Sequence, residues 1–434
     1  MKFKNTLFLP LFIIVLSCKQ SSENNLLKAH LDTEQRQQAS SHSYKQMTLV
    51  LPGANQTQTY LPLVKGKKIA LAANPTSVIF HKGVGQQALS FDSEAADTKY
   101  FKTKDYTHLA DSLIHLGMQL IKVFSPEHGF RGRADAGETV KDGVDIHTKL
   151  PVISLYGRNK KPTPEDLKDV EIIIFDMQDV GVRFYTYIST LHYVMEACAE
   201  NNIPLIVLDR PNPNGYYVDG PILEKKSFLG LHPVPLVYGM TIGEYARMIN
   251  GEKWLAGEVH CDLTVVTCEN YDRSLRYHLP VKPSPNLPND KAINLYPSLG
   301  LFEGTHINAG RGTDYQFQLI GAPFFDPKQY SYTYTPVSKE GAKNPKHKDS
   351  LCFGLDLRTY PVLKEITLTW ILEAYQNTPE GYDFFKDPSF SLHAGNELLK
   401  QQIIAGMNEK AIKESWQPGI LTFLDIRQKY LLYP

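Results

Sequence analysis

The sequence predicts an α/β protein built on a parallel β-sheet and followed by a second domain. Five short runs rich in β-branched and aliphatic residues recur at residues 68–73, 121–124, 152–155, 172–175 and 205–208. Continuous apolar runs of this kind are typical of parallel strands that are buried on both faces. Helix-compatible stretches separate most of the runs, and polar residues follow each one. Because ligands of such sheets bind beyond the carboxyl ends of the strands, we expect the functional residues there.

The composition is that of a globular protein and argues against several functional classes. The chain of 434 residues has 46 Lys+Arg and 46 Asp+Glu, so its net charge is zero, and 42% of its residues are hydrophobic. A protein without a basic excess or a basic run is not expected to bind nucleic acid. At about 150 residues per domain, the length predicts two or three domains, each large enough to bury a core.

The N-terminal segment has the features of an export signal followed by a tether. Two lysines precede an apolar run at residues 6–16 that is too short for a permanent membrane span, so residues 1–17 are interpreted as a signal peptide. The run ends in VLSC, which resembles a lipobox and predicts lipid modification of Cys18; the alternative is an ordinary secretory signal with an incidental cysteine. Residues 18–47 are polar and are interpreted as a tether. We therefore expect an exported protein whose only membrane attachment is this anchor, facing the periplasm or held at the outer membrane.

Local signals in the first half of the chain predict two helices. An N-cap residue, a proline and an acidic pair at residues 163–166 predict a helix start. Farther along, Leu191, Val194, Met195 and Cys198 follow the spacing i, i+3, i+4, i+7, which predicts the core face of a second helix.

The pattern changes after about residue 220, where we expect a second domain. A capping box at residues 241–244 predicts a helix through Ile249, and residues 263–266 are a strand candidate. We therefore divide the folded part of the chain into residues 48–220, with the parallel sheet, and residues 221–434, a smaller α+β domain.

The expected second domain alternates irregular and helical segments. Residues 283–323 are rich in Pro, Asn and Gly, and the polar residues 328–350 are expected to form an exposed insertion. Helical periodicity returns at residues 368–375 and 398–407.

The sequence predicts neither a cofactor nor a metal. Residues 83–88 match the dinucleotide-binding pattern G-x-G-x-x-A, but no strand directly precedes them and no acidic residue ends a following strand at the required distance. Cys198, Cys261, Cys268 and Cys352 lack the spacing of a zinc site. Cys198 and Cys261 are expected to be small buried apolar residues. A single disulfide between two of the four cysteines is a further possibility, with the pair left unspecified.

The first cluster of candidate functional residues, FSPEHGFRG at residues 124–132, begins where a predicted strand ends. Its proline and glycines break regular structure, so we expect Glu127 on a shaped loop, with His128 and Arg131 beside it and Glu138 shortly after. A glutamate that such a loop partly desolvates can keep its proton near neutral pH and act as the general acid on a glycosidic bond. The alternative is a solvated carboxylate paired with Arg131.

A second cluster follows the strand predicted at residues 172–175. It brings Gln178, Asp179, Arg183, Tyr185 and Tyr187 together within ten residues. This set suits a sugar site, because amides and acids bind hydroxyls, the guanidinium can bind a carboxylate through two hydrogen bonds, and a phenol ring can cover a pyranose face. Asp176, directly after the predicted strand, and Asp179 could ligate a metal, but no third ligand at a recognisable spacing accompanies them. The alternative interpretation is helix capping and internal ion pairing.

Two further clusters complete the candidates. Residues 208–215, which include Asn212, follow the next strand and are either a domain hinge or the lining of a cleft. In the second domain, Glu303 and Arg311 lie in glycine-rich segments, where backbone can approach a ligand closely; a set of tight turns is the alternative.

These motifs, in this order, resemble the NamZ-type exo-β-N-acetylmuramidases, a bacterial family of glycoside hydrolases. The resemblance runs from about residue 65 to residue 325. It is carried by ANPT (73–76), SPEHG (125–129), AGE (136–138), QDVGVRFYTY (178–187), DRPNP (209–213), PSPN (283–286) and GRGT (310–313).

The resemblance implies a Rossmann-like catalytic domain and a smaller auxiliary α+β domain that closes a cleft over the site. It also implies the release of N-acetylmuramic acid, a β-1,4-linked sugar, from the non-reducing ends of peptidoglycan fragments during cell-wall turnover. Glu127 is the position expected to be catalytic. Glu138, Asp179 and Glu303 are the candidates for a second catalytic group.

The same resemblance suggests the residues that contact muramoyl glycan. They are Asn74, His128, Arg131, Gln178, Arg183, Tyr185, Tyr187, Asn212, Glu303 and Arg311. One arginine among Arg131, Arg183 and Arg311 is expected to bind the lactyl carboxylate that distinguishes N-acetylmuramic acid from N-acetylglucosamine, because a planar donor fork fits that group.

Two rival functions stay open on the sequence alone. A lipoprotein that binds wall glycan without cleaving it would use the same polar and aromatic residues. An amidase or esterase is disfavoured, because the chain lacks a G-x-S-x-G elbow and a paired signal of His with Cys or Ser. The absence of P-loop and H-E-x-x-H motifs argues in the same way against an NTPase and a zincin. A protein nucleophile, an activated water or the acetamide of the substrate could each serve the second half of a glycosidase reaction.

Overall fold

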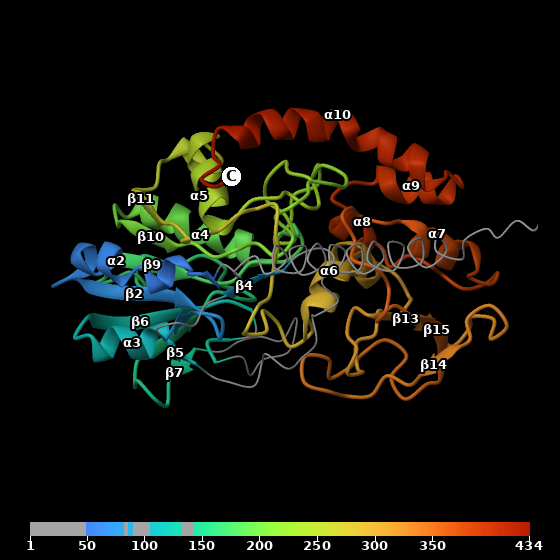
Figure 1. Ribbon diagram of the computed structural model, residues 1–434, viewed down its shortest axis with the longest axis horizontal. Coiled ribbons are helices and arrows are strands. Elements are labelled where there is room, and N and C mark those ends of the chain that lie inside the picture. The colour runs from blue at the N-terminus through green and yellow to red at the C-terminus, as the bar shows by residue number, and fades with distance from the viewer. Residues whose placement is uncertain (1–48, 82–85, 90–104, 128, 132–141) are drawn as a thin grey trace, which may run out of the picture. The chain divides into compact units, whose positions relative to one another are not determined.

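The structure is a computed structural model that describes residues 49–81, 86–89, 105–127, 129–131 and 142–434, of which 49–434 form one compact unit. Its main element in these residues is a seven-stranded β-sheet, parallel except for the short edge strand β7 (Figure 1). From edge to edge the strands are β11 (Leu263–Val266), β10 (Leu205–Leu208), β9 (Ile172–Asp176), β2 (Lys68–Ala73), β6 (Gln119–Ser125), β8 (Pro151–Ser154) and β7 (Gly143–Val144). The expected signal peptide, the tether and Cys18 lie outside the described residues.

The five predicted strands are confirmed, and all five are neighbours in this sheet. Strands β2 and β10 have the predicted bounds, and β6, β8 and β9 differ by one or two residues at their ends. The chain runs from β2 through β6 to β8 on one side of the sheet and then crosses to β9 on the other side of β2. The direction thus reverses between β2 and β9, and ligands of doubly wound sheets bind beyond the carboxyl ends of the strands near such a point.

Helices cover both faces of the sheet and make it a three-layer α/β fold. They are α2 (Thr57–Val64) and α3 (Leu109–His115) on one face and α4 (Tyr187–Glu200) and α5 (Ile242–Gly251) on the other. Alternation along β9 explains this arrangement, since Ile172 and Ile174 pack with α2 and α3, whereas Ile173 and Phe175 pack with α4 and α5. The confirmed α/β class therefore rests on strands that are apolar on both faces.

Two predicted helices are confirmed with their local signals. The stripe from Leu191 to Cys198 is fully buried in α4. Helix α5 begins with the expected capping box, in which the Thr241 hydroxyl accepts from the backbone of Glu244 and the Glu244 carboxylate accepts from the backbone of Thr241. Strand β11 then pairs with β10, so the parallel sheet extends past residue 220 to Val266. The expected domain boundary at residue 220 stays a prediction.

The helix predicted from residue 163 is wrong. Thr163 and Asp166 exchange the hydrogen bonds of a helix start, but the chain forms only turns up to Asp169. Asp169 has a positive φ of 64°, which a helix does not allow, and strand β9 begins at Ile172. The local capping signal is satisfied, but the chain must enter the sheet before a helix can lengthen.

The C-terminal part combines a small antiparallel sheet with helices. The sheet order is β13 (Leu319–Ala322), β15 (Cys352–Asp356) and β14 (Tyr332–Tyr334). The helices are α6 (Asp290–Leu299), η4 (Gly300–Gly304), α7 (Thr369–Gln376), α8 (Ser389–Ala394), α9 (Leu398–Ile404) and α10 (Glu409–Gln428). Helices α7 and α9 confirm the periodicity read at residues 368–375 and 398–407.

Residues 328–350 are mostly exposed, as expected, but they are not a separate insertion. This segment contributes β14 to the small sheet. Its Lys346 ammonium is mostly enclosed and donates hydrogen bonds to the carbonyl oxygens of Phe302 (2.6 Å) and Ile307 (3.2 Å). The carbonyl of Gly341 accepts hydrogen bonds from two side chains of the candidate site described below. The segment is therefore structural, although its composition is polar.

Short elements complete the fold. They are β1 (Leu49–Val50), η1 (Gly53–Asn55), β3 (Val78–Phe80), β4 (Gln86–Leu89), β5 (Tyr106–His108), η3 (Ala256–Glu258) and β12 (Arg276–Tyr277). The strands among them form a three-stranded sheet in the order β1, β4, β12 and a two-stranded sheet of β3 and β5.

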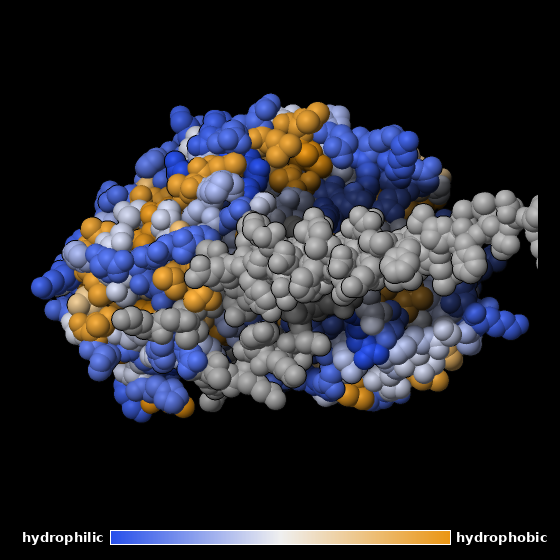
Figure 2. Space-filling view, viewed as in Figure 1, coloured by the Kyte–Doolittle hydropathy of each residue, from blue (hydrophilic) through white to orange (hydrophobic). Residues whose placement is uncertain are grey.

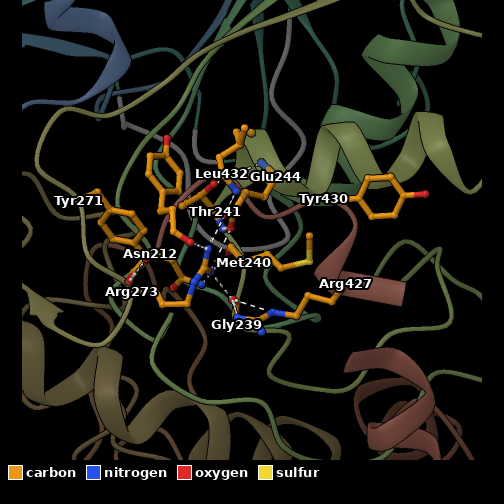
Figure 3. A network of polar contacts seen from close by, with 12 residues as sticks. Asn212, Gly239, Met240, Thr241, Glu244, Tyr271, Arg273, Arg427, Tyr430 and Leu432 are labelled. Carbon is orange, nitrogen blue, oxygen red and sulfur yellow. Dashed lines mark hydrogen bonds and ion pairs between the residues drawn. The ribbon is translucent and has the colours of Figure 1, made fainter. Parts of the chain in front are cut away.

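The C-terminal end of the chain is bound to the start of α5 by a buried polar network (Figure 3). Arg273 donates to the Glu244 carboxylate at 2.6 Å, and the backbone amide of Leu432 donates to the same oxygen at 2.7 Å. Arg273 and Arg427, the latter in the last turn of α10, both donate to the carbonyl of Gly239. Helix α10 thus connects the C-terminal helices to the parallel-sheet layer.

The visible surface has hydrophilic and hydrophobic regions, and the described cysteines are buried. On the face shown in Figure 2, visible residues near α9 are mainly hydrophilic, and hydrophobic residues gather over α10, where Leu421 is exposed. Within the described part of the chain, no helix combines the length and the apolar composition needed to cross a bilayer. All four cysteines there, Cys198, Cys261, Cys268 and Cys352, are buried and unbridged.

Candidate active site

A pocket of about 170 Å³ lies beyond the carboxyl ends of the parallel strands. It draws on the loops that follow β6, β8 and β9 and on the C-terminal part of the chain. Its lining residues are Glu127, Tyr156, Phe184, Tyr185, Thr186, Phe228, Leu229, Ser284, Asn286, Leu287, Tyr296, Glu303, Arg311, Phe317 and His393. Two carboxylates, Glu127 and Glu303, therefore face one small cavity.

Glu127 is held by hydroxyl groups from two neighbouring loops. The Thr186 hydroxyl, from the loop after β9, donates to Oε2 of Glu127 at 3.1 Å. Tyr156, from the loop after β8, also hydrogen-bonds Glu127, and burial together with the charge of Glu127 raises the pKa of this phenol. These contacts fix the position of the Glu127 carboxyl group in the pocket.

Glu303 is ion-paired. Arg311 donates from Nη1 to Oε2 of Glu303 at 2.6 Å and from Nη2 to the Gly341 carbonyl at 2.9 Å. Burial alone would raise the pKa of Glu303, but the charges of Arg311 and Lys346 lower it to about 2. Glu303 is therefore a carboxylate at neutral pH, and it cannot serve as a proton donor there.

Among the residues that the structure describes, two polar atoms of the pocket lack a hydrogen-bonding partner. The Asn286 Nδ2 group donates to the Gly341 carbonyl at 2.8 Å, which leaves Oδ1 as a buried acceptor without a donor. The Nε–H of Arg311 is a buried donor without an acceptor. Because unsatisfied buried polar groups are costly, these atoms are expected to be satisfied by a ligand.

The remaining walls are aromatic and neutral. The Tyr296 ring packs edge-on against Phe184, with centroids 5.1 Å apart, and against Phe317 at 4.7 Å. His393 donates from Nδ1 to the Ser389 carbonyl at 2.8 Å, and burial lowers its pKa, so Nε2 is an acceptor at neutral pH. Aromatic walls with a few polar atoms are typical of sites for small polar ligands such as a sugar.

Comparison with known proteins identifies the family. Residues 95–291 match the family model "Exo-beta-N-acetylmuramidase NamZ, N-terminal", and residues 294–433 match the corresponding C-terminal model. The chain belongs to the NamZ family. It is 39% identical over 394 residues to the peptidoglycan β-N-acetylmuramidase NamZ of Bacillus subtilis (strain 168), a match that covers 86% of this chain and 89% of the relative.

Two solved structures of DUF1343-family proteins from Bacteroides fragilis share the fold. One is 40% identical with a TM-score of 0.76, and the other is 26% identical with a TM-score of 0.69. Each comparison covers 89% of this chain and 99% of the other chain. The architecture is therefore shared over almost the whole length of both relatives.

Residues from both NamZ family matches line the pocket. Glu127 and Thr186 lie in the N-terminal match, whereas Glu303, Arg311 and His393 lie in the C-terminal match. Of the residues expected from the sequence, the structure brings Glu127, Tyr185, Glu303 and Arg311 to this pocket; His128 and Glu138 lie outside the described residues. The catalytic and binding roles of these residues stay predictions.

The two other candidate arginines lie elsewhere and have other partners. Arg131 is ion-paired with Asp111 (3.0 Å) and Asp145 (2.9 Å). Arg183 is fully buried and donates to backbone carbonyls, which include those of Pro221 at 2.7 Å and Ala394 at 2.6 Å. Neither guanidinium lines the pocket, so Arg311 is the one candidate of the three that can meet a ligand there.

Asp179, Gln178 and Asn212 make hydrogen bonds between loops near the site. Oδ2 of Asp179 accepts from the Gly181 backbone at 2.6 Å and from the Tyr238 hydroxyl, and burial raises the pKa of Asp179 to about 6. Gln178 donates to the Pro211 carbonyl at 2.6 Å, and Asn212 donates to the Met240 carbonyl at 2.8 Å. These three side chains join loops to one another and do not line the pocket.

Asn74 and the two tyrosines of the second cluster also have structural partners. The Asn74 side chain accepts two hydrogen bonds from Thr76 in the turn after β2. The hydroxyls of Tyr185 and Tyr187 point to the carbonyl of Pro283, at 2.5 and 3.4 Å. They thereby hold the segment that carries Asn286, and only the Tyr185 ring reaches the pocket.

The sequence did not reveal several pocket residues. Tyr156, Phe228, Tyr296, Phe317 and His393 come from separate segments, and no local motif marks them. Thr186 and Asn286 lie inside strings that carry the family resemblance, and that position was the available signal.

The two acidic residues of the second cluster, Asp176 and Asp179, have protein partners. Asp176 binds Arg210, with a distance of 2.6 Å between Oδ1 and Nε. Among the residues that the structure describes, no group of three or more His, Cys, Asp or Glu side chains could hold a metal ion.

Proposed function

We propose that this protein is an exo-β-N-acetylmuramidase that removes a β-1,4-linked N-acetylmuramoyl residue from the non-reducing end of peptidoglycan fragments. The observation that carries the proposal is a small aromatic pocket with two carboxylates in different electrostatic settings. Glycosidases use such a pair around the scissile bond. The membership of the chain in the NamZ family supports the choice of sugar.

Glu127 is the proton donor in this proposal. Cleavage of a glycosidic bond requires protonation of the leaving oxygen, and a positioned carboxyl group supplies it. Thr186 and Tyr156 hold the Glu127 carboxyl in place through hydrogen bonds. Orientation of this kind reduces the entropic part of the barrier.

Glu303 remains anionic and stabilises positive charge at the anomeric carbon. Its ion pair with Arg311 keeps it ionised throughout the neutral range. The stereochemistry of the released sugar, measured by NMR, tests how the bond is completed. Net inversion excludes both a covalent glycosyl intermediate and participation of the acetamide, since each of these routes retains configuration.

Arg311 and Asn286 recognise the substrate through hydrogen bonds. In this proposal the Nε–H of Arg311 donates to the lactyl carboxylate, and Oδ1 of Asn286 accepts from a hydroxyl or an acetamide N–H. Among the described residues, neither atom has a hydrogen-bonding partner. A bound muramoyl residue would satisfy both atoms. N-acetylglucosamine lacks the carboxylate and would leave the Arg311 donor unsatisfied.

The experiment measures N-acetylmuramic acid released by the full chain from a chromogenic β-muramoyl glycoside, with the matching β-N-acetylglucosaminide as the comparison. We expect release from the first substrate and little from the second. Glu127→Gln should lower release, whereas Glu165→Gln, a control at an exposed glutamate, should not. Binding of wall glycan without any release by the parent would contradict the proposal and favour a recognition lipoprotein.

We also propose that Cys18 carries a lipid that anchors the mature protein to the cell envelope. The support is the sequence of residues 1–18, with two lysines, an apolar run and the lipobox-like ending. Labelling with a radioactive fatty acid in a bacterial host should mark the parent and not Cys18→Ser. Equal labelling of the two proteins, or recovery of both in the soluble fraction, would contradict the anchor.

A further inference from the structure

A second cavity, of about 380 Å³, lies in the C-terminal part of the chain. Its functional groups are His306, Phe324, His347, Tyr382 and Asp383. None of them lines the pocket that holds Glu127, and none belongs to a motif that the sequence analysis singled out. The volume is in the range of sites for small organic ligands, which is about 300–1,000 Å³.

Two aromatic rings form one side of this cavity. The centroids of Phe324 and Tyr382 are 4.5 Å apart, with an angle of 33° between the ring planes. The Phe324 ring also contacts His347 edge-on at 5.9 Å. Tyr382 is 56% exposed although it rests on Phe324. An exposed ring fixed on a second ring offers a flat surface for the apolar face of a ligand.

The polar groups of the cavity suit hydroxyl groups. Nε2 of His347 lies 2.6 Å from the carbonyl oxygen of His306, so this nitrogen carries the proton and Nδ1 is an acceptor in the neutral ring. Partial burial lowers the pKa of the mostly exposed His306 ring and of the His347 ring, and the nearby Lys386 lowers that of His306 further, so both rings are neutral at neutral pH. The His347 ring therefore offers its Nδ1 acceptor to a hydroxyl donor, and the neutral His306 ring has one donor and one acceptor, as a sugar hydroxyl does.

One segment separates this cavity from the candidate active site. Glu303 faces the pocket with Glu127, and His306, three residues later, faces the second cavity. Lys346 fixes the segment by donating to the carbonyls of Phe302 (2.6 Å), Glu303 (3.3 Å) and Ile307 (3.2 Å). The next residue, His347, binds the His306 carbonyl. A ligand in the second cavity would therefore lie beside the segment that forms one wall of the candidate active site.

We propose that the second cavity is a saccharide-binding site that holds sugar residues of the wall glycan other than the one removed. The inference rests on the proposed function for the kind of glycan, and on the aromatic surface and hydroxyl-matched groups for the chemical class. A site of this kind would increase the affinity for long glycans by adding a second point of attachment. It would add nothing for a substrate that contains a single sugar.

The binding test uses N-acetylglucosamine oligosaccharides, which contain no muramoyl bond and are not expected to be cleaved. Calorimetric titration of the full chain compares the parent with Tyr382→Ala and His306→Ala, both at exposed positions. Tyr360→Ala is the matched control, because Tyr360 is also a partly exposed tyrosine that rests on another ring, that of Trp370. We expect binding by the parent and the control, and an affinity lower by about tenfold in Tyr382→Ala.

Kinetics provide a second readout. Tyr382→Ala should raise KM for glycan fragments of several sugars and leave hydrolysis of the chromogenic muramoyl monosaccharide unchanged. Equal binding and equal kinetics in the parent and Tyr382→Ala would overturn the proposal, as would binding of a wall stem peptide, and not of saccharides, at Tyr382. Absence of hydrolysis by the parent would contradict the proposed enzymatic function, whereas saccharide binding that depends on Tyr382 would still support this site.

Discussion

Arg311 donates a 2.6 Å hydrogen bond to Glu303 at the wall of a pocket whose other carboxylate, Glu127, is held by hydroxyl groups. The two carboxyl groups therefore have different electrostatic surroundings. In glycosidases, such a difference in surroundings lets one carboxyl group act as an anion and a chemically similar one act as an acid. The two halves of the chain meet at this pocket, since Glu127 lies in the N-terminal family match and Glu303 in the C-terminal one.

Replacement of Arg311 should reduce sugar selectivity. In Arg311→Ala, the ratio of kcat/KM for β-muramoyl over β-N-acetylglucosaminyl glycosides should fall by about tenfold or more, because a charge-assisted hydrogen bond to the lactyl carboxylate is lost. The ratio from paired progress curves checks this. Full retention of the muramoyl preference would show that Arg311 does not read the carboxylate.

Replacement of Arg183 should affect stability and leave selectivity unchanged. Arg183→Met removes the donors for buried carbonyls that include those of Pro221, Val234 and Ala394, which should cost about 3 kcal/mol of unfolding free energy. Urea unfolding measures the loss. Arg183→Lys, which keeps three donors, is the matched variant and should lose less. A loss of muramoyl preference at unchanged stability would instead place Arg183 in substrate recognition.

The Glu303 ion pair should make stability depend on pH in the acid range. The pKa of Glu303 in the folded protein is lowered to about 2, below the ordinary glutamate value of 4.5, so its ionised form stabilises the folded state above pH 4.5. That contribution is lost as the pH falls through about 2. Glu303→Gln should therefore be less stable than the parent at pH 7, and the difference should shrink between pH 5 and pH 3. A difference that is constant across this range would contradict the assignment.

The hydroxyl groups that hold Glu127 should matter for the chemical step. Thr186→Val and Tyr156→Phe each remove one donor to the Glu127 carboxyl while keeping the size of the side chain. We expect kcat to fall by about tenfold in each, with a small change in KM, because a misplaced acid transfers its proton less often. Single-turnover measurement of aglycone release checks this, and Tyr360→Phe is the control. A rise in KM at constant kcat would assign the hydroxyls to substrate binding.

The sequence was sufficient for the five central strands of the sheet, because their signals are local, but not for its edges: β7 was not predicted, and β11 was expected in the second domain. Buried parallel strands are continuous apolar runs, and all five were found within two residues of their bounds. The capping box of α5 is likewise a four-residue pattern. The helix expected at residue 163 failed because the geometry of the sheet, which starts β9 at Ile172, overrides a satisfied cap.

The site was only partly predictable, because its residues meet through tertiary structure. Glu127, Glu303 and Arg311 were marked by strings around them, whereas Tyr296 and His393 reach the pocket from helices that carry no chemical motif. Arg183 shows the opposite error. It lies in a conspicuous motif, but its guanidinium satisfies backbone carbonyls. Neither the burial nor the partners of a charged side chain can be read from its sequence neighbours.

The most direct test of the central claim compares two leaving groups in the parent and in Glu127→Gln. A general acid matters for a poor leaving group, such as the sugar hydroxyl of the N-acetylmuramoyl–N-acetylglucosamine disaccharide. It matters little for a dinitrophenyl glycoside, whose leaving group departs without a proton. We expect Glu127→Gln to lose about 10²-fold or more in kcat/KM on the disaccharide and less than about tenfold on the dinitrophenyl glycoside. Equal losses on the two substrates, or no loss on the disaccharide, would contradict the assignment of Glu127 as the acid.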